Sequence, residues 1–250
     1  MKVIKRGLTS FQLKITALII MTIDHFGAYA LFTDSPEINN HMRIIGRIAA
    51  PVFLFLLAEG LRHTRGKKKY IMRLYTAAVI TELVRGFFDI KMGNIFQTFF
   101  YAALYIACLE TIINLMRSGN VRPCALLSAN ILMVLPILFA VLPDYLILRA
   151  LVPSLLDIEY TYFFVILAVC WYFINNKYIN CAVFAGLAII LRFFRLFGGS
   201  LQWFMVLALP FMLLYNGKKG RGGLKYFFYI YYPAHQILFF VISAYILDRR

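Results

Sequence analysis

The side chains of this sequence that could do chemistry begin with Lys14 and His25, which share the first apolar segment with Asp24. A titratable group in hydrocarbon is costly, so its presence there is by default a functional-site hypothesis. Eleven helical residues return to within about 20° of the same face, roughly 16 Å further along the axis. The spacing predicts a cation at the mouth of one helical face and an imidazole deep in line with it. Such a face could hold a long anionic cofactor by its charged end and bring the other end to a base.

A second histidine, His235, lies in the last apolar segment at a depth similar to that of His25. The two imidazoles could meet in one cavity if the first and last helices are neighbours. Near neutral pH an imidazole can remove a proton from an acceptor or carry an acyl group itself. Asp24 lies about 100° round the helix from His25, which favours a structural or supporting role. The alternative is that both histidines are structural side chains satisfied by hydrogen bonds.

Two arginines, Arg43 and Arg47, are four residues apart near the predicted outer end of the second apolar segment. A buried carboxylate needs a partner, and Arg47 lies at a depth comparable with that of Asp24 on the next, antiparallel helix, so we predict this ion pair. The alternative is that the arginines snorkel to the membrane surface. Arg47 or a tyrosine is also the candidate oxyanion donor for an acyl-transfer intermediate.

Further acidic residues interrupt the third and fourth apolar segments. Glu82, Arg85 and Asp89 are spaced to share one helical face, which predicts an ion-pair ladder, with an outward-facing acceptor vestibule as the alternative. Glu110 is either the buried partner of a basic residue or an interfacial group.

The elements that position these residues follow from composition. Hydrophobic residues make up 62% of the 250 residues, charged residues 15%, and the mean hydropathy is +0.76, whereas a soluble domain carries about a quarter charged residues. Apolar runs of about 20 residues are long enough for helices that cross a bilayer. We therefore predict an all-α, polytopic transmembrane helical bundle formed by one domain, residues 1–250. Its expected spans number about nine: 12–32, 43–62, 70–88, 94–116, 122–143, 160–174, 178–197, 200–215 and 226–247. Residues 145–157 are too short to cross and predict an interfacial or re-entrant piece.

The net charge of +15 does not indicate nucleic acid, because most of the 26 Lys and Arg residues lie in short connections between apolar runs. These basic connections alternate along the chain, as cytoplasmic loops do. The pattern predicts a multi-pass protein of the cytoplasmic (cell) membrane with a cytoplasmic N-terminus and contacts to anionic lipid. The four cysteines have no disulfide or metal spacing, and no metal site is predicted.

Four sequence blocks in order resemble the TraX family. They read L-K-x-x-A-L-x-x-M-x-x-D-H-x-G, R-I-I-G-R-I-A-x-P-x-F-x-F-L-L-x-E-G-x-x-H-T-R, Y-N-G-K-x-G and K-Y-F-F-Y-x-x-Y-P-x-H. The resemblance covers about the first 100 and the last 40 residues, while the middle matches only in hydrophobicity. The family is named for the membrane protein that acetylates the N-terminus of F-type pilin. Membership implies acetyl-CoA or a related acyl-CoA bound from the cytoplasm, and transfer to an acceptor at the outer face.

TraX proteins in turn resemble the acyltransferase-3-like group of multi-span acyltransferases, which acetylate extracytoplasmic glycans. That group carries an Arg or Lys, ten residues, and then a His in an early span, a pattern that Lys14 and His25 match. The resemblance implies a catalytic set consisting of His25, Asp24 and His235. It implies a donor-binding set consisting of Lys14, Arg47, Lys225 and Tyr232.

The predicted function is therefore that of an acyl-CoA-dependent N- or O-acyltransferase. Its acceptor is expected to be an amine or hydroxyl of a peptide or of a cell-envelope glycan or lipid. Two alternatives remain open. One is a transporter or flippase for an anionic lipid or solute, although the sequence shows no internal repeat of the kind many carriers have. The other is a non-catalytic assembly factor for a surface structure, which would not need His25 at that depth.

Overall fold

A computed structural model describes residues 7–31, 35–119, 122–142, 145–194 and 201–247. Within these ranges the secondary structure is helical, apart from one isolated bridge between Leu8 and Tyr215. The chain divides into two compact units, one formed by Met1–Leu56 with Ile174–Arg250 and the other by Leu57–Phe173. The single predicted domain stays a prediction.

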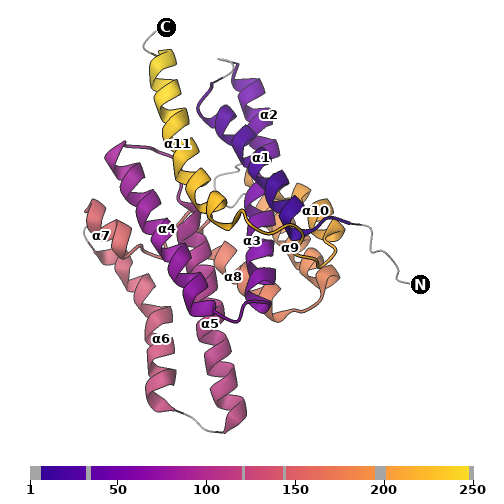
Figure 1. Ribbon diagram of the computed structural model, residues 1–250, viewed down its shortest axis with the longest axis vertical. Helices are drawn as coiled ribbons and strands as arrows, with labels where there is room; N and C mark the ends of the chain where they lie inside the picture. The colour runs from indigo at the N-terminus through magenta and orange to yellow at the C-terminus, as the bar shows by residue number, and fades with distance from the viewer. Residues whose placement is uncertain (1–6, 32–34, 120–121, 143–144, 195–200, 248–250) are drawn as a thin grey trace. The chain divides into compact units, whose positions relative to one another are not determined.

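The first unit brings together helices from both ends of the sequence (Figure 1). Its elements are α1 (Ser10–Ala28), α2 (Pro36–Gly46), the first part of α3 (Ala49–Arg62), α9 (Lys177–Phe193), the 3₁₀ helix η2 (Leu201–Ala208), α10 (Leu209–Leu214) and α11 (Lys225–Leu247). Helix α1 begins with a capping box, because the Thr9 hydroxyl accepts from the Gln12 backbone N–H while the Gln12 side chain accepts from the Thr9 N–H. The cap fixes the start of the helix that carries Lys14 and His25.

The second unit contains α4 (Lys67–Phe87), α5 (Ile95–Ser118), α6 (Pro123–Leu138), the 3₁₀ helix η1 (Phe139–Val141), α7 (Leu146–Leu151) and α8 (Thr161–Phe173). Helix α5 packs against α4, α6 and α8. It ends at Gly119, whose φ of 65° is the left-handed conformation that favours glycine at a helix end.

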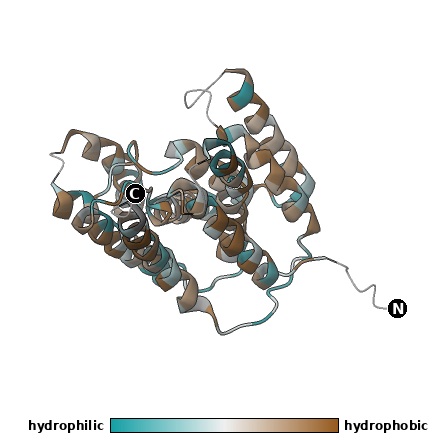
Figure 2. Cartoon of the chain, turned by 90° about the horizontal axis from the view of Figure 1, so that it is seen from above, coloured by the Kyte–Doolittle hydropathy of each residue, from teal (hydrophilic) through white to brown (hydrophobic). Residues whose placement is uncertain are grey.

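Within the described residues, four helical stretches are long and apolar enough to cross a membrane: Pro36–Arg62, Ile95–Ser118, Pro123–Val141 and Tyr226–Tyr245. Large apolar side chains are exposed along such helices, as lipid contact requires; on α6, Leu127 is 62% exposed and Leu138 57%. Figure 2 shows hydrophobic residues, coloured brown, along much of the length of the helices. The prediction of an all-helical membrane protein is confirmed for the described residues. The nine spans and the cytoplasmic N-terminus stay predictions, and α7, with six residues, is too short to cross.

The second predicted span, 43–62, is longer than expected and is interrupted. Helix begins at Pro36, and the α-helical hydrogen bonds stop at Arg47 and Ile48, whose N–H groups donate to Ile44 and Ile45 instead. Pro51 has no N–H to donate to the carbonyl of Arg47, so the backbone tightens there. The break lies beside the polar residues of the first unit.

Candidate functional site

The polar centre of the first unit is a pair of buried histidines. His25 Nδ1 lies 2.5 Å from His235 Nε2. The rings are nearly parallel, with centroids 4.7 Å apart and an interplanar angle of 10°. His25 is 5% exposed and His235 4%. The structure thus brings together the two imidazoles whose matching depths in the sequence suggested that they could meet.

The histidines meet because α1 and α11 are parallel neighbours (Figure 1). Contacts between them advance together along both helices. Lys14 Nζ lies 5.9 Å from the Phe228 ring centroid, Thr22 Oγ1 2.7 Å from the Tyr231 hydroxyl, and the Phe26 ring 4.6 Å from that of Phe239. If both helices cross the bilayer, they cross in the same direction, so an odd number of crossings must lie between them. The predicted nine spans satisfy that condition.

Aromatic side chains of α11 surround the histidine pair. The Tyr231 ring stacks on His235 with centroids 5.0 Å apart, and the Tyr231 carbonyl lies 2.8 Å from His235 Nδ1. Tyr232, which is 5% exposed, has its ring centroid 6.4 Å from that of His25 and 5.6 Å from that of His235. Tyr232 therefore lies beside the histidine pair, and Tyr231 is a further contact of His235.

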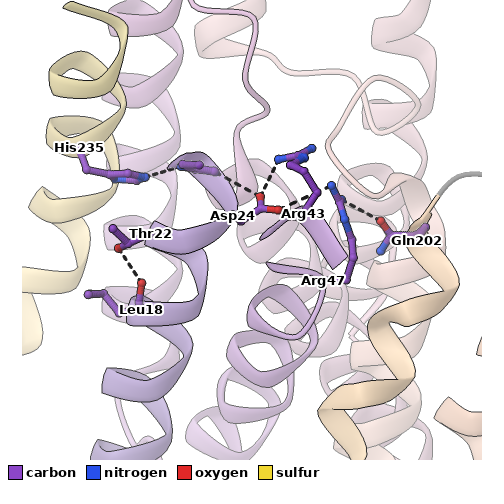
Figure 3. Close-up of polar contacts among 8 residues, drawn as sticks. Leu18, Thr22, Asp24, Arg43, Arg47, Gln202 and His235 are labelled. Atoms are coloured by element: carbon purple, nitrogen blue, oxygen red, sulfur yellow. Dashed lines mark hydrogen bonds and ion pairs between the residues drawn. The ribbon is translucent and has the colours of Figure 1, made fainter. Parts of the chain in front are cut away.

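Asp24 lies on the other side of His25, between α1 and α2 (Figure 3). Its Oδ2 accepts from Arg43 Nη1 at 2.7 Å and is 3.9 Å from His25 Nε2. Arg47 Nη2 is 3.9 Å from Asp24 Oδ1. The predicted ion pair between Arg47 and Asp24 is thus present, and Arg43 adds the direct hydrogen bond, which was not predicted. The rotation of α2 decides between the two arginines, and their spacing alone does not reveal it.

Two glycines allow the close approach of α1 and α2. A Cβ added at Gly46 would lie 2.1 Å from Asp24 Oδ1, and one added at Gly27 would lie 2.7 Å from the Asn39 carbonyl oxygen. Real Cβ atoms do not approach this closely. The absence of side chains at these positions therefore lets the Asp24 carboxylate reach the arginines.

Arg47 extends the site to η2. Its Nη1 donates to Gln202 Oε1 at 3.2 Å, and the Gln202 amide lies 3.7 Å from the Met205 sulfur. Arg47 Nε is buried and has no hydrogen-bond partner among the described residues. Sequence reasoning missed Gln202 and Thr22, and the signal that could have found them is the same in both cases: an uncharged polar residue within an apolar run.

The expected cationic mouth lies at the N-terminal end of α1. The segment 214–219 is bound to this end by backbone hydrogen bonds, in which Leu8 donates to Leu214, Ser10 to Lys218, and Phe11 to Lys219 at 2.8, 2.8 and 3.1 Å. Gly220, with φ of 73°, packs so closely that an added Cβ would lie 2.5 Å from Thr9 Oγ1. A basic loop is thus built onto the helix that carries Lys14. Lys225 begins α11, and its side chain lies outside the described part of the chain.

A second buried carboxylate, Glu82, lies in the second unit and is 2% exposed. Its Oε2 accepts from Arg85, Asn94 and Gln97 at 2.6, 3.0 and 3.3 Å, and its Oε1 is 2.9 Å from Arg149 Nε.

The predicted ladder is correct for Glu82 and Arg85 and wrong for Asp89. Helix α4 ends at Phe87, and Asp89 has φ of 51°, so Asp89 leaves the helical face. It pairs instead with the exposed Lys91 at 2.5 Å.

Glu110 has a basic partner, as one of the two predictions had it, but Glu110 is only partly buried. Lys67 Nζ forms an ion pair with Glu110 and donates to the Tyr172 hydroxyl at 2.7 Å. Lys67 precedes the predicted span 70–88. Burial alone would lower its pKa, but the hydrogen bonds with Glu110 and Tyr172 outweigh burial and raise the pKa of Lys67. Arg62 forms an ion pair with Glu59 and donates to the Tyr172 carbonyl at 2.9 Å.

These features define a helical membrane protein with a histidine pair and a carboxylate buried between its first, second and last described helices. Comparison with known proteins assigns the family: the chain belongs to the TraX family, described as TraX protein, which matches residues 10–243. The match includes the middle region, where the sequence blocks gave no resemblance. It does not bear on the relation to the wider acyltransferase group, which stays a prediction.

One curated relative is the probable fimbrial assembly protein FimC, serogroup H1, of Dichelobacter nodosus. It is 27% identical over 242 residues, which cover 91% of this chain and 92% of the relative. No solved structure matches the chain at a significant level.

Proposed function

We propose that this TraX-family protein is an acyltransferase of the cytoplasmic membrane. It takes an acyl group, in the first instance acetyl, from cytoplasmic acyl-CoA and gives it to an amine or hydroxyl of a peptide or cell-envelope acceptor at the outer face. The observation that carries the proposal is the buried contact of His25 with His235 of α11. His25 lies on α1, which also carries Lys14. A base and a cation lie eleven residues apart on one helix, about 16 Å along its axis.

His25 is the proposed reacting residue, because its Nε2 faces Asp24 and its Nδ1 is occupied by His235. In direct transfer, His25 Nε2 takes the proton of the acceptor N–H or O–H as the acceptor attacks the thioester carbonyl. The C–S bond then breaks, and the CoA thiolate leaves and receives a proton. If His25 attacks the thioester first, the C–S bond breaks, the thiolate leaves and the acyl group rests on Nε2. The acceptor then attacks the acyl carbon, the Nε2–C bond breaks, and the proton of the acceptor passes to the thiolate. Since His25 is 5% exposed, the thioester reaches it only when covering side chains move aside.

The proposed donor end is Lys14 together with the basic loop bound to the start of α1. Lys14, Lys218, Lys219 and Arg221 form no ion pair with a carboxylate of the described residues. Cations without carboxylate partners suit phosphate groups such as those of CoA. Lys225 at the start of α11 joins this set by its position in the sequence.

Arg47 is the proposed oxyanion donor. Asp24 carries one negative charge against the two positive charges of Arg43 and Arg47, which leaves an excess positive charge beside the histidines. The buried Arg47 Nε–H has no partner among the described residues. A fixed donor of this kind stabilises charge that develops on a thioester oxygen during attack.

The experiment is thioester turnover by the full chain in nanodiscs with labelled acetyl-CoA, with and without added amine, hydroxyl or peptide acceptors. We expect free thiol to be released and label to move to the acceptor or protein. His25→Ala is expected to lower turnover by about 10²- to 10⁴-fold, whereas His41→Ala is the matched control, because His41 is exposed on α2. Lys14→Ala is expected to raise KM for acetyl-CoA, and Lys91→Ala is not. Full turnover by His25→Ala would overturn the assignment of the reacting residue.

A non-catalytic assembly factor for a surface structure is the second candidate, and the name of the relative, a probable fimbrial assembly protein, favours it. It predicts that wild type neither binds CoA nor hydrolyses acetyl-CoA, and that His25→Ala supports surface-structure assembly in cells as well as wild type does. The acyltransferase proposal predicts the opposite in all three measurements.

A further inference from the structure

The hydrogen bonds of His235 fix where its proton lies. His235 Nδ1 is 2.8 Å from the backbone carbonyl oxygen of Tyr231. A carbonyl oxygen only accepts, so Nδ1 must carry the hydrogen. In a neutral ring the other nitrogen, Nε2, is then an acceptor with a lone pair.

The same reasoning extends to His25. Its Nδ1 lies 2.5 Å from the lone pair of His235 Nε2, and two lone pairs cannot face each other at that distance. His25 Nδ1 must therefore donate. In a neutral His25 the lone pair is then on Nε2, the nitrogen that faces Asp24 Oδ2 at 3.9 Å, beyond hydrogen-bond length.

From this chain of contacts we infer that His235 is a positioning residue, which holds neutral His25 in the tautomer with hydrogen on Nδ1 and a lone pair on Nε2. Neutral histidine in water favours the opposite tautomer, with hydrogen on Nε2, and that form cannot take a proton at Nε2. The functional meaning of the inference rests on the acyltransferase proposed above. The tautomer itself does not.

A second contact holds α1 and α11 in the register that brings His235 to His25. The Thr22 hydroxyl donates its one hydrogen to the Leu18 carbonyl at 2.9 Å. The Tyr231 hydroxyl, 2.7 Å from Thr22 Oγ1, must therefore be the donor between them. Tyr231 thus anchors α11 to α1 through its side chain and orients His235 through its carbonyl.

The arrangement also accommodates the product of proton uptake. When His25 Nε2 gains a proton, the cation lies 3.9 Å from the Asp24 carboxylate, and its Nδ1–H keeps His235 as acceptor. The Arg43 hydrogen bond at 2.7 Å keeps Asp24 in place. None of these three contacts has to rearrange when His25 takes up the proton.

The test is ¹⁵N NMR of histidine-labelled full chain in nanodiscs, about two pH units above the ordinary histidine pKa, with His25 assigned by the signal lost in His25→Ala. Protonated and unprotonated ring nitrogens have well-separated ¹⁵N shifts. We expect an unprotonated Nε2 in His25 of wild type. His235→Asn, one methylene too short to reach His25, is expected to move His25 towards the Nε2–H tautomer. His235→Gln, whose amide oxygen can occupy the place of Nε2, is expected to keep the wild-type tautomer.

Turnover is measured on the same samples, after thermal unfolding has shown that both variants fold. His235→Asn is expected to lose roughly 10²- to 10⁴-fold, as enzymes with a wrong histidine tautomer do, and His235→Gln is expected to recover most of it. A protonated Nε2 in neutral wild-type His25, or identical tautomers in the Asn and Gln variants, overturns the inference. The expected tautomers without any thioester turnover would instead overturn the proposed function and leave the role of His235 in place.

Discussion

Asp24 in the first unit and Glu82 in the second are both buried carboxylates with two arginines nearby, but their surroundings differ. Both oxygens of Glu82 have partners, and four side chains hold the carboxylate. Asp24 Oδ2 has one hydrogen bond, from Arg43, while the buried Oδ1 has no hydrogen-bond partner among the described residues, with Arg47 3.9 Å away.

The difference lies in the carboxylate oxygens, and it favours a structural role for Glu82 and the proposed reactive role for Asp24. Buried polar groups are normally satisfied, and one that is not needs an explanation such as a catalytic role. In the Glu82 cluster both carboxylate oxygens have partners, although Arg85 Nε and Asn94 Oδ1 beside them have no hydrogen-bond partner among the described residues. The Asp24 cluster keeps an unused oxygen, an unused Arg47 N–H and an imidazole lone pair within one region. This difference supports the proposal that chemistry takes place at Asp24 and His25, and it favours a folding role for Glu82.

The largest expected effect on stability is that of removing the Glu82 carboxylate, which tests its structural role. Glu82→Ala leaves Arg85 and Arg149 without their carboxylate and is expected to lower the free energy of unfolding by about 3–5 kcal/mol, measured by denaturant titration in micelles. Asp89→Asn is the control, since Asp89 and Lys91 are over 80% exposed and the expected change is below about 1 kcal/mol. Equal effects of the two changes would contradict the contrast drawn here.

Gly46→Ala tests whether the close approach of α2 maintains the Asp24 cluster. The added Cβ would lie 2.1 Å from Asp24 Oδ1, and relieving this overlap is expected to cost about 1–3 kcal/mol and to move Asp24 away from Arg43. Gly186→Ala, where the added Cβ meets nothing within 4 Å, is expected to stabilise α9 by about 0.5–1 kcal/mol. Thermal unfolding of both variants checks the opposite signs.

Asp24→Asn tests the proposed catalytic role of the Asp24 carboxylate. The change keeps the size of the side chain and removes its charge, so the free energy of unfolding is expected to fall by only about 1–2 kcal/mol. Turnover is expected to fall about 10- to 100-fold, because the carboxylate no longer stabilises protonated His25. Parallel unfolding and thioester assays check this. A loss of stability as large as that of Glu82→Ala, with turnover intact, would make Asp24 a structural residue too.

The sequence predicted the positions of the helices better than the contacts within the site. The expected span 94–116 matches α5 (Ile95–Ser118), because its limits are set by the length of the apolar run and by flanking polar residues. Arg43, and not Arg47, makes the direct hydrogen bond to Asp24. Which arginine does so depends on how α2 is rotated about its axis and on the break near Pro51. Gln202 comes from a distant segment, and no local pattern indicates which helix it faces.

Lys67→Met is expected to have the smallest effect and extends the comparison to a partly exposed pair. Lys67 and Glu110 are 23% and 31% exposed, so the expected loss of stability is below about 1 kcal/mol. Because the pKa of Lys67 is raised, the pair is fully formed below the ordinary lysine pKa and is lost only as pH rises through the raised value. The loss in the free energy of unfolding caused by Lys67→Met should therefore be the same at about pH 6 and about pH 8.

The parallel contact between α1 and α11 sets the time at which the site is completed during biosynthesis. His25 and His235 are 210 residues apart in sequence, and every other described helix is translated between them. During membrane insertion, His25 Nδ1 on α1 lacks its hydrogen-bond acceptor, His235 Nε2, until α11 enters the membrane. Contacts of such long range form late and carry a high loop-closure cost. A chain interrupted before α11 would hold Lys14 and Asp24 but lack His235, so the proposed acyl transfer would require the finished protein.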